Sequence, residues 1–446
     1  MKFPVNEGMK IEVAYVKAYQ DMDRIIARQA AEGNYVALGL TSNLDVLCDF
    51  QIDIINKLLV EYMPDADLNT MQSAKIIRDM EEFLETVVFY CKNGIGGEVD
   101  IADIRILENL FKTENAIGGT AVHGAMALAA VGFASIVHLT DDSKEVCDIL
   151  QSPFIYTINT DGQLLHMQDV EQSWDQEVHL IIQFKKGDVI RLKNQEIIIP
   201  SSNRLIIPEI VVNKLVPLSK PFFKYIEDNA KHISSHVLSS FHGIEDTTVL
   251  AKRLTFLKQH IKRYKTHNKR GIIYCEDAHY HSSEVRKMCV ESLYSAIDIL
   301  SLNEEELLYN LQADHVDVVI DNIISCVNGV RYLKQRYGIQ KGVIVHTKDY
   351  SMYVGDHLEV DIEGGLIYGN LLGTAKAMFG SYGTKEQIKE ILTLPISSKG
   401  MENKEIIDAL QSADQIVLVP TKYIDTPKYT VGLGDSFTAG VQMCFN

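Results

Sequence analysis

Short runs of β-branched and aliphatic residues alternate with amphipathic stretches along most of this 446-residue chain. Near-continuous apolar strands are typical of a parallel sheet that helices cover on both faces. The stretches between them carry the apolar spacing of helices. The alternation therefore predicts an α/β fold. The expected strands are Tyr35–Leu40, Phe133–Leu139, Arg270–Glu276, Lys341–Thr347 and Gln415–Pro420, and the expected helices include Ser282–Ile299, Asp317–Arg336 and Thr384–Thr393.

One stretch, Phe154–Pro208, departs from this alternation. It holds several short strands separated by the turn signals Thr160-Asp161-Gly162 and Lys186-Gly187-Asp188. A mainly antiparallel piece inserted in a parallel α/β chain indicates a second, smaller domain. The length of the chain also favours more than one core. The cleft between two such domains is a common place for a ligand.

Composition restricts the class of partner. The formal net charge of −17 argues against nucleic acid or an anionic membrane surface as a partner. The longest apolar stretch, Ala121–Leu139, contains His123 and a break at Gly132, so we expect a helix followed by a strand rather than a membrane span. Met1–Asp21 lacks the apolar core of a secretory signal, and the seven scattered cysteines form no CxxC pair. We therefore expect a cytoplasmic protein with reduced, buried thiols.

The segment TVGLGDSFTAG (Thr430–Gly440) places an acid next to two glycines, where a helix is expected to begin. Glycines let backbone amides approach a ligand, and a helix N-terminus offers unpaired N–H groups to an anion. Asp435 is then either an ordinary N-cap or first-turn acid, worth ~1 kcal/mol, or a proton acceptor. In the second case the amides of Leu433 and Gly434 hold a transferring phosphoryl group while Asp435 deprotonates the attacking hydroxyl.

Three further segments also admit an ordinary structural interpretation. Gly118-Gly119 predicts a tight turn into an apolar helix. Asn43 and Asp45 end an expected strand, at the edge of the sheet where α/β proteins bind ligands, although an Asx turn uses the same residues. Asn303 and Glu306 have the spacing of an N-cap followed by a first-turn glutamate.

Together, and in this order, these segments resemble the ADP-dependent glucokinase/phosphofructokinase family of the ribokinase-like superfamily. The matching segments are NLD, GIGGE, IGG, HLIIQF, SNRLI, YCEDA, LNEEEL, VHT and TVGLGDSFTAG, which extend over nearly the whole chain. The resemblance implies a ribokinase-like three-layer α/β/α core with a mostly parallel central sheet, plus a smaller α+β lid domain. The core is expected to comprise residues 1–45, 113–153 and 209–446, and the lid residues 46–112 and 154–208.

The resemblance also implies roles for single residues. Asp435 matches the catalytic base, Gly432, Leu433 and Gly434 match the anion-hole backbone, and Arg204 matches an arginine that faces the active site from the lid. The other expected residues form three groups: acceptor-binding Asn43, Asp45, Glu98, Gly118, Gly119 and His242; nucleotide-binding His346, Thr347, Tyr350 and Val431; and Glu276, Asn303, Glu306 and Asp435 around Mg²⁺.

The chain departs from the family pattern at four positions. Tyr274 replaces the usual histidine of a His-x-Glu segment, although Glu276 is retained, and Ile95 replaces a usual basic residue. His242 stands where a glutamine is expected, and His123 lies in a helix that is apolar in the family. Most of these positions lie on the sugar side, so they bear on the acceptor more than on phosphoryl transfer.

The leading hypothesis is a kinase that moves the β-phosphoryl group of ADP to a sugar hydroxyl, with Mg²⁺, and releases AMP. The choice of ADP is implied by the resemblance alone. An ATP-dependent sugar or nucleoside kinase and a catalytically silent sugar- or nucleotide-binding protein are the alternatives. Neither a nucleic acid nor a membrane is an expected partner, and a monomer or small homo-oligomer is expected.

Glucose and fructose 6-phosphate are the expected acceptors. A sugar phosphate needs a basic cluster, which Lys185, Lys186 and Arg204 could supply, whereas a neutral sugar relies on acids such as Glu98. Both features are present, and the sequence slightly favours fructose 6-phosphate or the use of both sugars.

Overall fold

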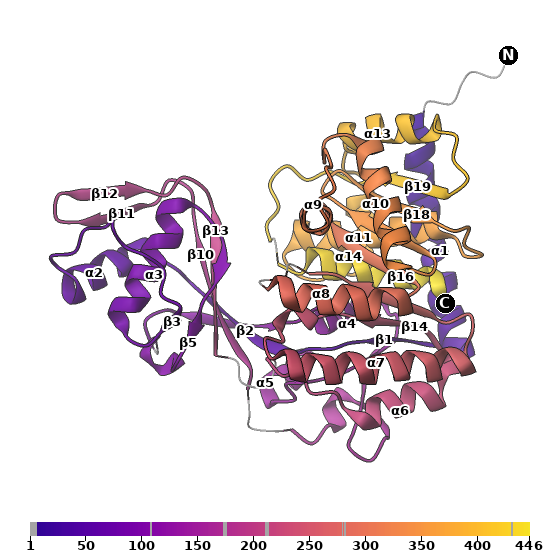
Figure 1. Cartoon of the computed structure of the whole chain (residues 1–446), viewed down its shortest axis with the longest axis horizontal. Helices are drawn as coiled ribbons and strands as arrows, with labels where there is room; N and C mark the ends of the chain where they lie inside the picture. Colours follow the sequence, from indigo (N-terminus) through magenta and orange to yellow (C-terminus); the bar gives the residue numbers. More distant parts are fainter. Residues whose placement is uncertain are drawn as a thin grey trace.

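The computed structural model describes residues 7–107, 109–172, 176–209, 214–278, 280, 282–429 and 431–446. The chain forms two lobes (Figure 1). The large lobe is built on a ten-stranded sheet and the small lobe on a five-stranded sheet. Within the described ranges, no helix has the length and apolar character that crossing a membrane requires. All seven cysteines are unpaired, and five of them are buried.

The large sheet is mostly parallel, as the sequence predicts. Its order is β19-β18-β17-β16-β15-β14-β1-β7-β8-β9. Neighbours pair in parallel except β8 with β9 and β18 with β17 and β19. The strands are β1 (Tyr35–Leu38), β7 (Ser135–Val137), β8 (Ile155–Ile158), β9 (Leu164–His166), β14 (Ile233–Leu238), β15 (Ile272–Glu276), β16 (Ile299–Asn303), β17 (Gly342–His346), β18 (Tyr350–Gly355) and β19 (Gln415–Pro420).

Helices cover both faces of this sheet, which makes three layers. Along β15, Ile273 and Cys275 enter one apolar cluster while Ile272 and Tyr274 enter the other, because successive side chains of a strand point to opposite faces. The first cluster includes side chains of α6 (Lys220–Asp228), α7 (Thr247–His267), α8 (Ser283–Leu293), α9 (Glu304–Ala313) and α10 (Ile323–Tyr337). The second includes side chains of α1 (Glu7–Glu32), α4 (Thr120–Val131), α5 (Lys144–Ile149), α11 (Ile362–Phe379), α12 (Lys385–Ile391) and α14 (Leu433–Gln442). α13 (Ser398–Asp408) packs beside β19.

The strands within the Phe154–Pro208 stretch pair antiparallel with one another, as expected, but the sheet of the small lobe as a whole is mixed. Its order is β4 (Gly97–Glu98), β13 (Asn203–Glu209), β10 (Val178–Phe184), β2 (Asn43–Cys48) and β6 (Thr113–Gly118). β2 pairs in parallel with β10, and β4 with β13. α2 (Ile52–Tyr62) and α3 (Met80–Asn93) pack on one face. Two further strand pairs are β11 (Val189–Leu192) with β12 (Gln195–Ile198) and β3 (Ile76–Ile77) with β5 (Asp100–Ile101).

Strand pairing corrects the expected domain boundaries. β8 and β9 lie within the predicted lid segment 154–208, but β8 pairs with β7 and extends the large sheet. β6 was expected in the core, but it pairs with β2 in the small sheet. β2 itself begins at Asn43, so the crossing between lobes precedes the predicted boundary at 45/46. Turn signals locate a hairpin, but they do not specify which sheet it joins.

Candidate active site

Two cavities adjoin at the N-terminus of α14. The α11 cavity, about 300 Å³, is lined by α11, α14 and the segments that follow β17 and β19. The interlobe cavity, about 350 Å³, is lined by strands of the small lobe and by loops of the large lobe. Leu433 and Gly434 line the α11 cavity, whereas Gly432 and Asp435 line the interlobe cavity. The G-x-G-D residues therefore form a wall that the two cavities share; Thr430, at the start of the motif, lies outside the described residues.

The turn into α14 presents backbone amides that the helix itself does not use. Gly432 is the N-cap residue, and its φ of 72° lies in the left-handed region that favours glycine. The first backbone hydrogen bond of the helix runs from Ser436 N–H to the Gly432 carbonyl (3.0 Å). The amides of Leu433, Gly434 and Asp435 precede that bond, so the helix does not use them. Together with the helix dipole they form a site suited to an anion.

Asp435 occupies the first turn of α14 and faces the interlobe cavity. Burial raises the pKa of its carboxyl group to about 6, although a hydrogen bond with Thr120 favours the charged form. Glu276 raises this pKa further, while His346 and Lys376 lower it. A carboxyl group with this pKa is ionised at neutral pH and basic enough to accept a proton from a positioned hydroxyl.

Asn43 and Asp45 lie at the start of β2 rather than at the end of β1 as expected. Asn43 Nδ2 donates to Asp45 Oδ1 (2.7 Å), and His179 Nδ1 lies 3.5 Å from the same oxygen. His179 is opposite Asp45 in the β10–β2 register. A Cβ atom on Gly118 would lie 2.2 Å from Asn43 Nδ2, so only glycine leaves room for this pair. Burial raises the pKa of Asp45 to about 7.

Alternation along the small sheet explains how so many polar groups reach one cavity. Its apolar face packs on α2 and α3, and alternate residues therefore point toward the large lobe. These are Asn43 and Asp45 on β2, His179 and Ile181 on β10, and Arg204 and Ile206 on β13. All six predicted acceptor residues line this cavity together with Arg204 and Asp435: Asn43, Asp45, Glu98, Gly118, Gly119 and His242.

A cluster of acids lies beside the α14 turn, at the ends of β15 and β16. Glu276 Oε1 is 3.0 Å from His346 Nε2, and Glu276 Oε2 accepts from Thr438 Oγ1 (2.6 Å). Burial, and then the neighbouring Asp277 and Glu276, raise the pKa of Glu306 to about 8. Burial disfavours a charged His346, yet the Glu276 carboxylate raises the pKa of that imidazole overall.

The cluster fits a hydrated magnesium ion better than a cation held in a protein cage. No group of three or more histidine, cysteine or acidic side chains among the described residues is placed to hold a metal directly. The accumulated negative charge that raises the pKa of Glu306 would attract a cation, and magnesium keeps much of its water. Asn303 and Glu306 form a capping box: Asn303 Oδ1 accepts from the backbone N–H groups of Glu305 and Glu306 (both 2.9 Å), and Glu306 Oε2 accepts from Asn303 N–H (2.9 Å). The metal role predicted for Asn303 is therefore not supported, and Glu306 could reach a hydrated ion only from this cap.

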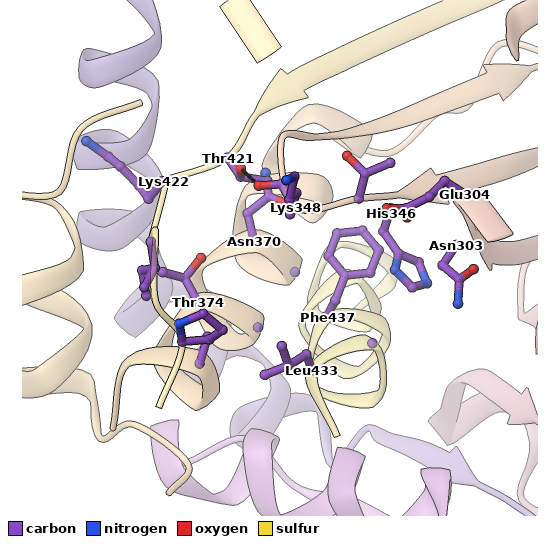
Figure 2. Close-up of a pocket in the computed structure, with 17 residues that line it drawn as sticks. Asn303, Glu304, His346, Lys348, Asn370, Thr374, Thr421, Lys422, Leu433 and Phe437 are labelled. Carbon is purple, nitrogen blue, oxygen red and sulfur yellow. Dashed lines mark hydrogen bonds between the residues drawn. The ribbon is translucent and has the colours of Figure 1, made fainter. Parts of the chain in front are cut away.

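The predicted nucleotide residues separate in the structure. His346 and Thr347 line the α11 cavity, where Figure 2 shows His346, Phe437 and Leu433 around one space. Val431 lines the interlobe cavity instead. Tyr350 lines neither cavity: its side chain is buried beside Cys326, so the prediction for it is not supported. Thr347 and Tyr350 close a tight turn through the bond from Tyr350 N–H to Thr347 Oγ1 (3.0 Å).

Three residues of the site have no counterpart among the predicted residues. Thr438 lies three positions after Asp435, on the same face of α14, so helical spacing could have identified it. His179 reaches Asp45 only through pairing of distant strands. Lys376 interacts electrostatically with Asp435 from α11, and no local signal marks it.

Comparison with known proteins identifies the family of the chain. The conserved region of the ADP-specific phosphofructokinase/glucokinase family matches residues 34–443. An ADP-dependent glucose/glucosamine kinase of Pyrococcus abyssi is 22% identical over 452 residues, covering 96% of this chain and 98% of that protein. An ADP-specific phosphofructokinase of Thermococcus kodakarensis is 22% identical over 445 residues, covering 92% and 95%.

Solved structures share the fold. A hypothetical ADP-dependent phosphofructokinase from Pyrococcus horikoshii superposes with a TM-score of 0.77 at 20% identity, covering 92% of this chain and 97% of that one. An ADP-dependent kinase in complex with fructose 6-phosphate and ADPβS gives 0.76 at 19% identity, covering 99% and 98%. The three-layer α/β/α core with its smaller lobe, as predicted, is therefore the fold that these proteins share. The chain belongs to the ADP-specific phosphofructokinase/glucokinase family and is a phosphotransferase of that type, acting on an alcohol acceptor.

Proposed function

We propose that this protein transfers the β-phosphoryl group of ADP to a hydroxyl of a hexose or hexose phosphate and releases AMP. The observation that carries the proposal is the shared wall at the start of α14. A donor in the α11 cavity would direct its terminal phosphoryl group at the amides of Leu433 and Gly434. An acceptor in the interlobe cavity would place a hydroxyl beside Asp435. Membership of the family supports ADP as the donor.

In this mechanism Asp435 takes the proton of the attacking hydroxyl. The amides of the α14 turn and the helix dipole stabilise the charge of the moving group. Arg204 adds positive charge from the small lobe, and closure of the lobes would exclude water from the transfer. Glu276 and Glu306 would hold magnesium through its water molecules. Bound magnesium would neutralise part of the negative charge of the phosphates.

The lining of the interlobe cavity favours a neutral hexose. Lys185 and Lys186, the expected phosphate ligands, are exposed in the turn after β10 and do not line the cavity. Lys214 lines it but forms an ion pair with Asp100. Glu98 lies in the same wall and suits sugar hydroxyl groups. Fructose 6-phosphate remains the second candidate, because Arg204 could bind its phosphate.

An acceptor panel with ADP and magnesium tests this function. Glucose or glucosamine should release AMP with a kcat/KM at least about tenfold above that of fructose 6-phosphate, the size of one charged hydrogen bond gained or lost. The converse order would assign the protein to fructose 6-phosphate. Release of ADP from ATP would establish the ATP-dependent alternative. Binding of nucleotide without turnover of any sugar would establish the silent binding protein.

Activity should fall in acid as Asp435 becomes protonated. Its pKa is raised to about 6, so half of the base is lost at that pH, and at pH 5 kcat/KM should be about tenfold below its value at neutral pH. The kcat/KM for ADP is best measured between pH 5 and 8 at saturating sugar. The acceptor then already occupies Asp45, whose own titration would otherwise contribute to the profile. A profile that stays flat down to pH 5 would exclude Asp435 as the base.

A further inference from the structure

Lys376, on α11, is buried in an aromatic setting. Only 6% of its surface is exposed. Its Nζ lies 4.1 Å from the ring centroid of Tyr382 and 5.3 Å from that of Tyr429, and it donates to the Gly380 carbonyl (3.3 Å). A desolvated ammonium above a tyrosine ring is attracted by the negative face of the ring. The two rings and the carbonyl therefore hold the ammonium in place.

Contacts continue from this ammonium to the α14 turn. The Tyr382 hydroxyl is hydrogen-bonded to Nδ1 of His123, on α4. The His123 ring packs directly against Gly432: a Cβ atom on that glycine would lie 2.8 Å from His123 Nδ1. Gly432 has no side chain with which to cap α14, so its position depends on such packing. Lys376 thus supports the turn through Tyr382 and His123, and it also contacts Tyr429, which lies three positions before Gly432.

The same ammonium places positive charge near the acids of the interlobe cavity. Burial lowers the pKa of Lys376, while Asp435 and Asp45 raise it. Glu276 from β15 and His346 from β17 are the other charged groups that act on Asp435, and Arg204 acts on Asp45. Arrival of a phosphoryl group adds negative charge to this region. The positive charge of Lys376, which acts on Asp435, would offset that addition.

We propose that Lys376 is a positioning residue for phosphoryl transfer. It fixes the Gly432 turn, and with it the N-terminus of α14, through Tyr382 and His123. Lys376 lines neither cavity, so we assign it a positioning role rather than a catalytic one. This inference rests on the proposed function and adds a positioning residue to the same site. An apolar side chain would fill the space without the cost of desolvating a charge, which indicates a purpose beyond packing.

Kinetics of Lys376→Met and Lys376→Arg test the inference. Lys376→Met should lower kcat about 10- to 100-fold, the cost of a slightly misplaced reacting group, with the KM for ADP changed less than about twofold. Lys376→Arg keeps the charge and should recover most of the kcat. Lys385→Met is the matched control: Lys385 Nζ also lies over a tyrosine, 5.6 Å from the Tyr19 ring centroid, but outside the site, so kcat should not change. A Lys376→Met enzyme with a kcat within twofold of wild type would overturn the proposal.

Hydrogen exchange provides a readout that needs no turnover. Amides of residues 431–436 should exchange about tenfold faster in Lys376→Met and in Tyr382→Phe, which loses the hydroxyl bonded to His123, while exchange in the small lobe stays unchanged. Unchanged exchange at the turn would overturn the positioning role even if kcat falls. If the wild-type protein turned over no sugar, the proposed function would fail while exchange still decided whether Lys376 supports the turn.

Discussion

Asp435→Asn is expected to fold, to bind ADP and to lose phosphoryl transfer by about 10³- to 10⁴-fold, near the upper range for loss of a general base. Asparagine keeps the shape of the side chain and can still hydrogen-bond Thr120, but it cannot take the hydroxyl proton. The loss should therefore appear in kcat, measured as AMP release, while calorimetric titration shows ADP affinity close to wild type. Near-normal turnover would exclude the mechanism proposed for Asp435.

Two controls distinguish the loss of the base from general damage to the fold: the melting temperature of Asp435→Asn and the kinetics of a variant at a neighbouring carboxylate. Burial already disfavours the Asp435 charge, so replacing it with a neutral amide should leave the melting temperature unchanged or raised. Asp45→Asn is the matched control, because Asp45 is also a buried carboxyl group with a raised pKa on the same cavity. Asp45 is expected to hold the acceptor, so its variant should raise the KM for the sugar more than it lowers kcat.

Local spacing was sufficient to predict the elements that carry the site. The apolar runs gave five strands of the large sheet, and the glycine turns located the starts of α4 and α14. These features depend on neighbours within one or two turns of chain, so the sequence contains them directly. The sequence does not show that the acid and glycines of the α14 turn separate two cavities. That position became clear only from the fold, because the two cavities are formed by segments far apart in sequence.

Long-range pairing accounts for what the sequence could not provide. Turn residues predicted the β8–β9 hairpin, but its membership of the large sheet follows from the contact between Ser135 and Ile155. His179 joins the acceptor wall through the register of β10 with β2. Lys376 would ordinarily be read as an exposed helix residue, since lysine is almost never fully buried. Its burial results from contacts with Tyr382 and Tyr429, which no spacing on α11 reveals.

Gly119→Ala is expected to lower the free energy of unfolding by about 3–5 kcal/mol, combining backbone strain with a steric clash. Gly119 is the N-cap of α4, and its φ of 104° lies in a region that L side chains rarely adopt. An added Cβ would also lie 2.4 Å from the Thr41 carbonyl oxygen. That atom is backbone, in the segment where the chain crosses from β1 to β2, so relief of the clash would move Asn43 as well. Denaturant unfolding measures the loss, and the KM for the sugar should rise with it.

Gly162→Ala is the matched control for Gly119→Ala, because it introduces backbone strain without a steric clash. Gly162 has a φ of 80°, in the β8–β9 turn, but nothing lies within 4 Å of its added Cβ. It should cost only the ~1–2 kcal/mol of a left-handed alanine and leave the KM for the sugar unchanged. Suppose that Gly119→Ala loses more free energy of unfolding than Gly162→Ala. The close contact between the backbone of Gly119 and that of Thr41 would then be shown to hold the acceptor-binding residues in position. Equal losses of unfolding free energy would show that the Thr41 backbone can move away from the added Cβ, and that the position of the acceptor residues does not depend on this contact.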